Sequence, residues 1–253
     1  MITVGVDLGA EAKRTALAVV QWQGREAWLT DVSTTADDDL ILEVAAVADK
    51  VGIDCPLGWS DDFIEFVNAH HTGRVDRTPV DATARLPLRY RATDLDLIER
   101  NLGRPLSGSS DLIGVCAMRA AGLLAAMMKA GMEIDRSGVS GRVAETYPAA
   151  AVRHWGLGYA SYKGTAKTAA LGAMVDQLSH ALPQLDLGDH EEICRDSDDA
   201  FDALMCALVA RATTVYRGTT QIPSALIQRA KREGWIAVPS CHLFELLAPP
   251  EFE

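Results

Sequence analysis

The chain lacks the sequence features that mark secreted, membrane-spanning and zinc-binding proteins. Its five cysteines are odd in number and widely spaced, with no Cys-x-x-Cys pair, which argues against a disulfide framework or a zinc site. No apolar run approaches the ~20 residues that a membrane-spanning helix needs, and nothing near Met1 resembles a signal peptide. We therefore expect a cytoplasmic protein, with no membrane partner and with buried thiols.

Positive charge is also scarce, because the formal net charge is −11 at pH 7. A protein this acidic is poorly suited to nonspecific binding along duplex nucleic acid, although a local basic groove is compatible with it. The length of 253 residues and the hydrophobic content of 48% fit a single large domain, 1–253. We expect an insertion over 57–140, where turns and short helices interrupt the pattern.

The order of the predicted elements is typical of a mixed α/β fold. Strands are predicted at 2–8, 15–22, 26–33, 50–54 and 141–146, with a short final strand at 235–238. Helices are predicted at 37–50, 60–68, 93–101, 110–131, 148–156, 166–181, 198–216 and 224–233. The first three strands form a meander, and we expect the fourth to run parallel to the first.

Carboxylates stand where buried strands end. Asp7, Asp54 and Glu145 each follow a short apolar run. An ionised carboxylate is costly to bury without a partner, and several that converge are best explained by a bound cation. If the first and fourth strands are neighbours, they lie ~4.8 Å apart, and Asp7 can meet Asp54. Hard cations such as Mg²⁺ or Mn²⁺ prefer such oxygen ligands.

Each of these carboxylates also has a simpler interpretation. Asp7 could cap a turn at Gly9, and Asp54 could turn the chain before Pro56. Glu145 could be an exposed side chain at the end of a strand.

Two further acids lie on a predicted helix. Asp199 and Asp202 are three residues apart and therefore share a helix face. Acids in a first turn often only stabilise the helix dipole, which is the simpler interpretation for Asp196 and Asp198. Asp202 lies deeper, among apolar residues, and needs a partner. Asp198 is four residues before Asp202, so either Asp198 or Asp199 could accompany it.

A local basic segment stands out in this acidic chain. Residues 74–91 contain five arginines and only two aspartates. Arg89 and Arg91 are suited to bidentate phosphate contacts, and Tyr90 could stack on a base. Lys163 and Lys167 are further candidates for phosphate binding. The alternative is a solvated loop with local ion pairs, and lysines that serve solubility.

Several of these motifs together resemble the ribonuclease H-like superfamily. They are the strand Gly5-Val6-Asp7-Leu8, the strand end Ile53-Asp54-Cys55-Pro56-Leu57 and the helix Asp199-Ala200-Phe201-Asp202-Ala203-Leu204. The last is similar to the D-x-x-D-A-L motif of Holliday-junction resolvases of the RuvC type. More closely, nearly the whole chain resembles domain-of-unknown-function family 429, a group of predicted nucleases. Glu145-Thr146-Tyr147-Pro148-Ala149 and Tyr90-Arg91-Ala92-Thr93-Asp94 look like motifs of that group.

The resemblance implies a fold, a metal site and a reaction. The fold is a five-stranded mixed sheet in the order 3-2-1-4-5, flanked by helices. The implied metal ligands are Asp7, Asp54 and Asp202, with Glu145 and Asp199 as additional catalytic carboxylates. The implied reaction is hydrolysis of phosphodiester bonds with two Mg²⁺ or Mn²⁺ ions and a nucleic acid as substrate. Asp54 stands where superfamily members carry a glutamate.

Two other functions fit parts of the sequence. Asp7-Leu8-Gly9 with Lys13-Arg14 is similar to the first phosphate loop of small-molecule kinases of the actin-like superfamily. The sequence has no second Asp-x-Gly loop and no Gly-Gly adenosine loop, and its length leaves little room for their duplicated core. The third interpretation is a noncatalytic protein that binds nucleic acid or a partner and keeps a vestigial site.

Overall fold

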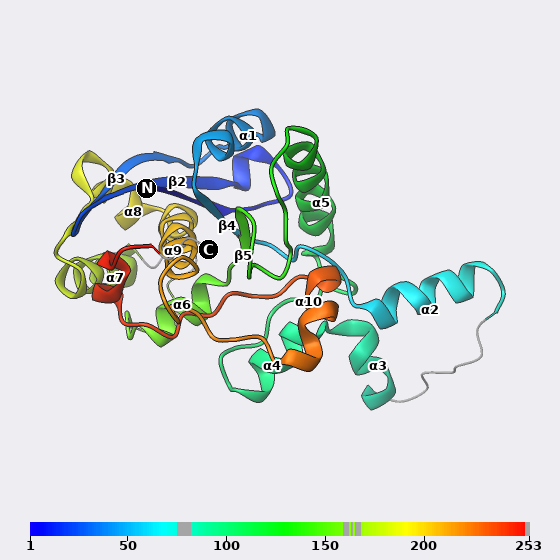
Figure 1. The fold of residues 1–253 in the computed structure, drawn as a ribbon. Coiled ribbons are helices and arrows are strands. Elements are labelled where there is room, and N and C mark those ends of the chain that lie inside the picture. Colours follow the sequence, from blue (N-terminus) through cyan, green and yellow to red (C-terminus); the bar gives the residue numbers. More distant parts are fainter. Residues whose placement is uncertain (75–81, 159–161, 163, 165–167, 251–253) are drawn as a thin grey trace.

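The computed structural model describes residues 1–74, 82–158, 162, 164 and 168–250. These residues form a six-stranded sheet in the order β5-β4-β1-β2-β3-β6, with helices on both faces (Figure 1). The strands are β1 (Ile2–Asp7), β2 (Ala16–Gln23), β3 (Glu26–Ser33), β4 (Lys50–Asp54), β5 (Val143–Glu145) and β6 (Leu185–Asp186).

The strand directions confirm the predicted topology. Strands β1, β2 and β3 form an antiparallel meander, and β4 and β5 run parallel to β1. The predicted order 3-2-1-4-5 is therefore present, and β6 extends it at the β3 edge. The sequence pattern did not predict β6. Only Leu185 and Asp186 pair with β3, and two residues are too few to show the alternation of apolar and polar side chains that marks a strand. The strand predicted at 235–238 is reduced to one bridge between Glu145 and Ile236.

The helices follow the predicted periodicity closely. They are α1 (Asp38–Val47), α2 (Asp61–His71), α3 (Ala82–Arg89), α4 (Ala92–Glu99), α5 (Gly114–Lys129), α6 (Pro148–His154), α7 (Thr168–Ala181), α8 (Glu191–Asp196), α9 (Asp198–Ala212) and α10 (Ile227–Glu233). Helices α3 and α8 were not predicted. Pro87 inside α3 argues against a helix on sequence grounds, and α8 is short. Helices α2 and α3 project away from the sheet (Figure 1).

The two faces of the sheet pack against different helices. On one face, Val4, Val6 and Ile53 share an apolar core with residues of α1 and α5 such as Ile41 and Leu124. On the other face, α9 is buried along almost its whole length. Because side chains of a strand alternate between faces, the residues beside these valines must point toward α9.

Two glycines allow α9 to lie directly on the sheet. A Cβ atom at Gly5 would overlap the carbonyl oxygen of Ala203, and one at Gly52 would overlap the carbonyl oxygen of Cys206. Both glycines are interior residues of strands, where glycine often marks a close backbone approach. The register places Gly5 beside Gly52, so β1 and β4 have adjacent positions without side chains where α9 packs.

We expect Gly5→Ala to prevent stable folding, because the methyl group collides with main-chain atoms that cannot move independently. The loss in the free energy of unfolding should exceed about 4 kcal/mol, measured by chemical denaturation. Gly122→Ala in α5 is the matched control, since nothing lies within 4 Å of its added Cβ. The control should be neutral or stabilising by up to about 1 kcal/mol. Equal stability of the two variants would contradict the packing described above.

Candidate active site at the ends of strands β1 and β4

Asp7 and Asp54 are direct neighbours at the carboxyl ends of two parallel strands. Asp7 is the register partner of Asp54, in the same ladder that pairs Gly5 with Gly52. Since each aspartate lies two residues after a glycine that faces α9, both carboxylates point to the α9 side of the sheet. Both are partly exposed. The proximity predicted from the sequence is therefore present in the fold.

These two strands lie where the chain connections diverge. The meander leads from β1 toward β2 and β3, whereas β4 leads on to β5 on the opposite side. In open α/β sheets, ligands bind in the crevice at the carboxyl ends of such strands. The two aspartates line this position.

Helix α9 brings a third carboxylate to the same region. Asp202 is completely buried, and its Oδ1 accepts a hydrogen bond of 2.7 Å from the hydroxyl of Tyr162. Burial, followed by the charges of Asp54 and Asp7, raises the pKa of Tyr162 above its ordinary range. The hydroxyl that holds Asp202 thus also experiences the two strand-end carboxylates. Tyr162 packs edge-on against Phe201, with ring centroids 5.9 Å apart.

Contacts in the first turn of α9 bear on whether Asp198 or Asp199 accompanies Asp202 in the site. Asp198 is another of the charges that raise the pKa of Tyr162, and its Oδ2 accepts a hydrogen bond of 2.9 Å from the amide of Gly164. Both Asp198 and Asp199 are partly buried. Asp198 is therefore a candidate companion that the ligand set implied by the resemblance does not include.

Glu145 lies on the other face of the sheet. It follows Val143 by two residues, and Val143 belongs to the core beside α5. Glu145 therefore points away from the side occupied by Asp7 and Asp54. Its carboxylate is buried and accepts hydrogen bonds from Arg91 at 2.6 and 2.7 Å and from the amide of Leu57 at 3.0 Å. The structure does not bring Glu145 together with the other predicted catalytic acids.

Arg91 is fully occupied by this structural role. The side chain is 3% exposed, and its N–H groups donate to Asp94, to Glu145 and to the carbonyl of Glu233. Burial acts to lower the pKa of Arg91, but Glu145 and Asp94 outweigh it and raise the pKa above its usual value. All five N–H bonds of the guanidinium are used, so in this conformation none is left to bind a phosphate.

The remaining predicted substrate contacts fall into two groups. Tyr90 is buried, and Arg89 lies over its ring at 4.9 Å, so its face is already covered. Arg89 itself is accessible and pairs with Asp111 at 3.4 Å, with 46% of its side chain exposed. Lys163 and Lys167 lie outside the described residues.

The loop after Asp7 does not offer an open phosphate cradle. The amide of Gly9 donates to the hydroxyl of Thr15, and Arg119 donates to the carbonyl of Gly9 at 2.8 Å. Lys13 pairs with Glu11 at 2.6 Å on the surface. The amide of Gly9 and the ammonium of Lys13, which a kinase would direct at a phosphate, are therefore engaged within the protein.

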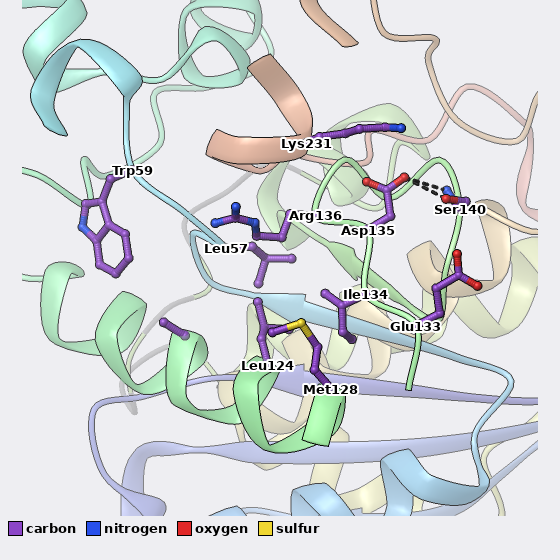
Figure 2. A pocket seen from close by; sticks show the side chains of 11 residues that line it. Leu57, Trp59, Leu124, Met128, Glu133, Ile134, Asp135, Arg136, Ser140 and Lys231 are labelled. Carbon is purple, nitrogen blue, oxygen red and sulfur yellow. Dashed lines mark hydrogen bonds between the residues drawn. The ribbon is translucent and has the colours of Figure 1, made fainter. Parts of the chain in front are cut away.

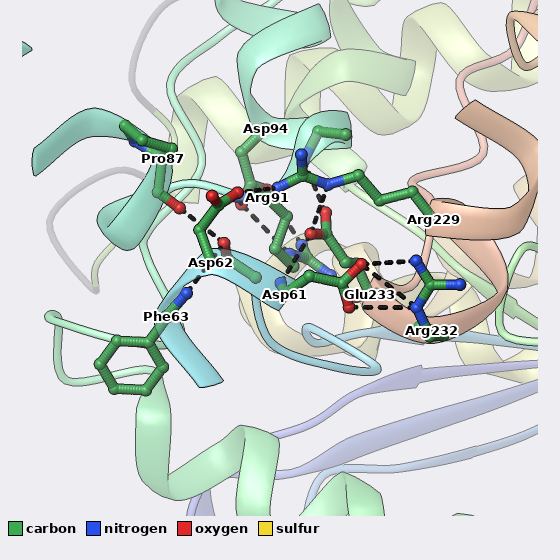
Figure 3. A network of polar contacts seen from close by, with 11 residues as sticks. Asp61, Asp62, Phe63, Pro87, Arg91, Asp94, Arg229, Arg232 and Glu233 are labelled. Carbon is green, nitrogen blue, oxygen red and sulfur yellow. Dashed lines mark hydrogen bonds and ion pairs between the residues drawn. The ribbon is translucent and has the colours of Figure 1, made fainter. Parts of the chain in front are cut away.

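A larger polar network surrounds Arg91 (Figure 3). Glu233 is fully buried and accepts hydrogen bonds from the amides of Asp61 and Ala92, which begin α2 and α4, and from Arg229. One carboxylate thereby stabilises the starts of two helices. Neither Glu233 nor Tyr162 was predicted from the sequence, because the amides that Glu233 binds and the carboxylate that Tyr162 binds are distant from them in the chain. Only their burial, which the sequence does not display, identifies them.

The metal-binding capacity of this region is limited in the part of the chain that is described. There, no group of three or more His, Cys, Asp or Glu side chains is arranged to hold a metal ion. The pair formed by Asp7 and Asp54 still fits Mg²⁺, which proteins commonly bind through one or two carboxylates, with water and substrate phosphates completing the shell. A divalent ion bound between two neighbouring carboxylates offsets their mutual repulsion.

The strand order, the strand directions and the paired aspartates define a mixed α/β protein of ribonuclease H-like topology. The chain belongs to the family described as protein of unknown function (DUF429), whose profile matches residues 5–226. The match spans both the sheet and the helices that project from it.

A solved structure of RuvC from Thermus thermophilus is 15% identical, with a TM-score of 0.36, and the alignment covers 94% of this chain and 99% of RuvC. No curated protein matches the sequence. None of the described helices is long and apolar enough to cross a bilayer.

We expect Arg91→Met to lower the free energy of unfolding by ~3–5 kcal/mol, because it leaves the carboxylates of Glu145 and Asp94 buried without their cation. Arg100→Met is the matched control, since Arg100 forms a partly exposed pair with Asp96 at 3.0 Å and should cost at most ~1 kcal/mol. Thermal and urea unfolding would measure both. Unchanged stability of the Arg91 variant would restore a substrate-binding role for this residue.

Proposed function

We propose that this protein is a divalent-metal-dependent phosphodiester hydrolase that acts on a nucleic acid. The observation that carries the proposal is the pairing of Asp7 with Asp54 at the divergence point of the sheet, with Asp202 held nearby on α9. Carboxylates at adjacent strand ends are a suitable ligand set for Mg²⁺ or Mn²⁺.

The residues have distinct parts in this proposal. Asp7 and Asp54, which are partly exposed, would hold the ion where a phosphodiester can approach. A bound divalent ion polarises a phosphoryl oxygen and lowers the pKa of a bound water. Tyr162 donates a hydrogen bond to the buried carboxylate of Asp202 and thereby orients it. The carboxylate oxygens of Asp7 and Asp54 can supply the protein ligands for one Mg²⁺ ion. We therefore propose one ion at this pair, rather than the two ions implied by the resemblance.

Nucleic-acid binding is assigned to the exposed arginines of the projecting helices. Arg74 follows α2, and Arg85 and Arg89 lie on α3; all three are exposed. Arginine binds phosphate through a planar fork, which suits contacts along a backbone. Because Arg91 and Tyr90 are buried, the surface arginines of the 74–91 segment are the better candidates for these contacts.

We expect purified protein to cleave labelled single-stranded, branched or hybrid nucleic acids in Mg²⁺ or Mn²⁺ but not in EDTA. Asp7→Asn and Asp54→Asn should each lower the rate at least about a hundredfold, since each removes a ligand charge at the reacting phosphate. Asp31→Asn, at an exposed position of β3, is the control and should retain full activity. Cleavage that survives Asp7→Asn would rule out this mechanism.

Mg²⁺ should also stabilise the folded protein in the absence of substrate. A ligand at 100 times its dissociation constant adds ~2.7 kcal/mol, which corresponds to a rise of several degrees in Tm. Differential scanning fluorimetry should show this rise for the wild type and a much smaller one for Asp54→Asn. An equal rise in wild type and in Asp202→Asn would mean that Asp202 orients the site without binding the ion.

A further inference from the structure

A pocket of about 550 Å³ opens on the α5 side of the sheet, on the opposite face from Asp7 and Asp54 (Figure 2). It lies between α5, the 133–140 segment, α10 and the chain that follows β4. Its volume is within the range of small-molecule sites. Leu57, Leu124 and Met128 form an apolar floor. None of the roles assigned above uses this pocket.

One wall of the pocket is an aromatic ring held in place. Trp59 lines the pocket, and its indole N–H donates a hydrogen bond of 3.2 Å to the carbonyl of Gly108. The ring is partly exposed. A fixed indole beside an apolar floor suits a flat, apolar ligand group such as a nucleobase, because every base has a π-face that can stack.

One acid at the far end of the pocket, Asp135, is already compensated, whereas the other, Glu133, is exposed. Asp135 accepts hydrogen bonds from the amides and hydroxyls of Ser137 and Ser140. Burial raises the pKa of Asp135, but these hydrogen bonds outweigh it and hold the pKa below its usual value. Burial lowers the pKa of the Lys50 ammonium to about 8, and the nearby charge of Asp135 opposes part of that shift. Figure 2 shows Lys231 extending over Asp135 from α10.

Two cations line this pocket, Lys231 and Arg136, and the more buried of the two is Arg136. It is half-buried, and Figure 2 shows its guanidinium turned toward Leu57 and the Trp59 side of the pocket. None of the ion pairs among the described residues involves Arg136. Its main chain is fixed, since its carbonyl accepts a hydrogen bond of 3.1 Å from the amide of Trp235. A half-buried guanidinium held over an apolar floor favours an anionic ligand.

We propose that this pocket binds a nucleoside monophosphate unit. The base lies on the apolar floor beside Trp59, and the phosphate binds the planar fork of Arg136. Trp59 and Arg136 both line the pocket, and Figure 2 shows the Arg136 guanidinium turned toward the Trp59 side. The unit is either a free nucleotide or the phosphorylated end of a strand, because both present the same chemistry.

Isothermal titration of the full chain, without metal and without turnover, tests this proposal. The probes are adenosine 5′-monophosphate, adenosine and a short oligonucleotide with or without a 5′-phosphate. We expect the monophosphate, the phosphorylated oligonucleotide or both to bind, and adenosine to bind more weakly. Arg136→Gln should weaken binding of the phosphorylated probe at least about tenfold and leave adenosine binding unchanged. Trp59→Leu should weaken adenosine and the phosphorylated probe alike.

The matched control is Arg25→Gln, in the exposed turn between β2 and β3, which makes the same charge change away from the pocket. It should bind all probes as the wild type does, and thermal melting should show that every variant is folded. Wild-type affinity in Arg136→Gln, or no binding of either phosphorylated probe at millimolar concentration, would overturn the proposal. Since the titration needs no cleavage, its outcome is independent of the proposed hydrolase.

Discussion

The candidate site depends on one contact, the direct packing of the α9 backbone on strands β1 and β4. Gly5 and Gly52 make this contact possible, because any side chain at either position would occupy the space of the helix backbone. The same contact sets the height of Asp202 above the sheet. It also buries Asp202 completely, so that its carboxylate depends on the hydroxyl of Tyr162. Packing and site geometry therefore have a common origin in two residues without side chains.

The alternation of side chains along the strands then sorts the acids into two groups. Asp7 and Asp54 share the α9 face and remain partly exposed, whereas Glu145 points to the α5 face. The buried carboxylate of Glu145 needs a cation, and Arg91 supplies it from a helix that begins far away in the sequence. This pair ties the start of α4 to the end of β5. A residue that resembles a catalytic acid in sequence thus has a structural role because of the face it occupies.

The sequence predicted the sheet order and the meeting of Asp7 with Asp54 because both follow from local patterns and strand pairing. It did not predict the partners of Glu145 or Asp202, since Arg91 and Tyr162 are 54 and 40 residues away along the chain. No local pattern encodes such a pairing. The interior strand glycines were a readable signal of close helix packing. Strand β6 could not be predicted, because its two pairing residues are too few to show an alternation of apolar and polar side chains.

The most direct test is a crystal structure of the protein soaked in Mn²⁺, with anomalous scattering used to locate the ion. Our account predicts an anomalous peak between the carboxylates of Asp7 and Asp54, on the α9 side of the sheet. It also predicts that this peak disappears in crystals of a variant with asparagine in place of Asp54. An ordered ion bound elsewhere, with both carboxylates held only by protein groups, would contradict the central claim.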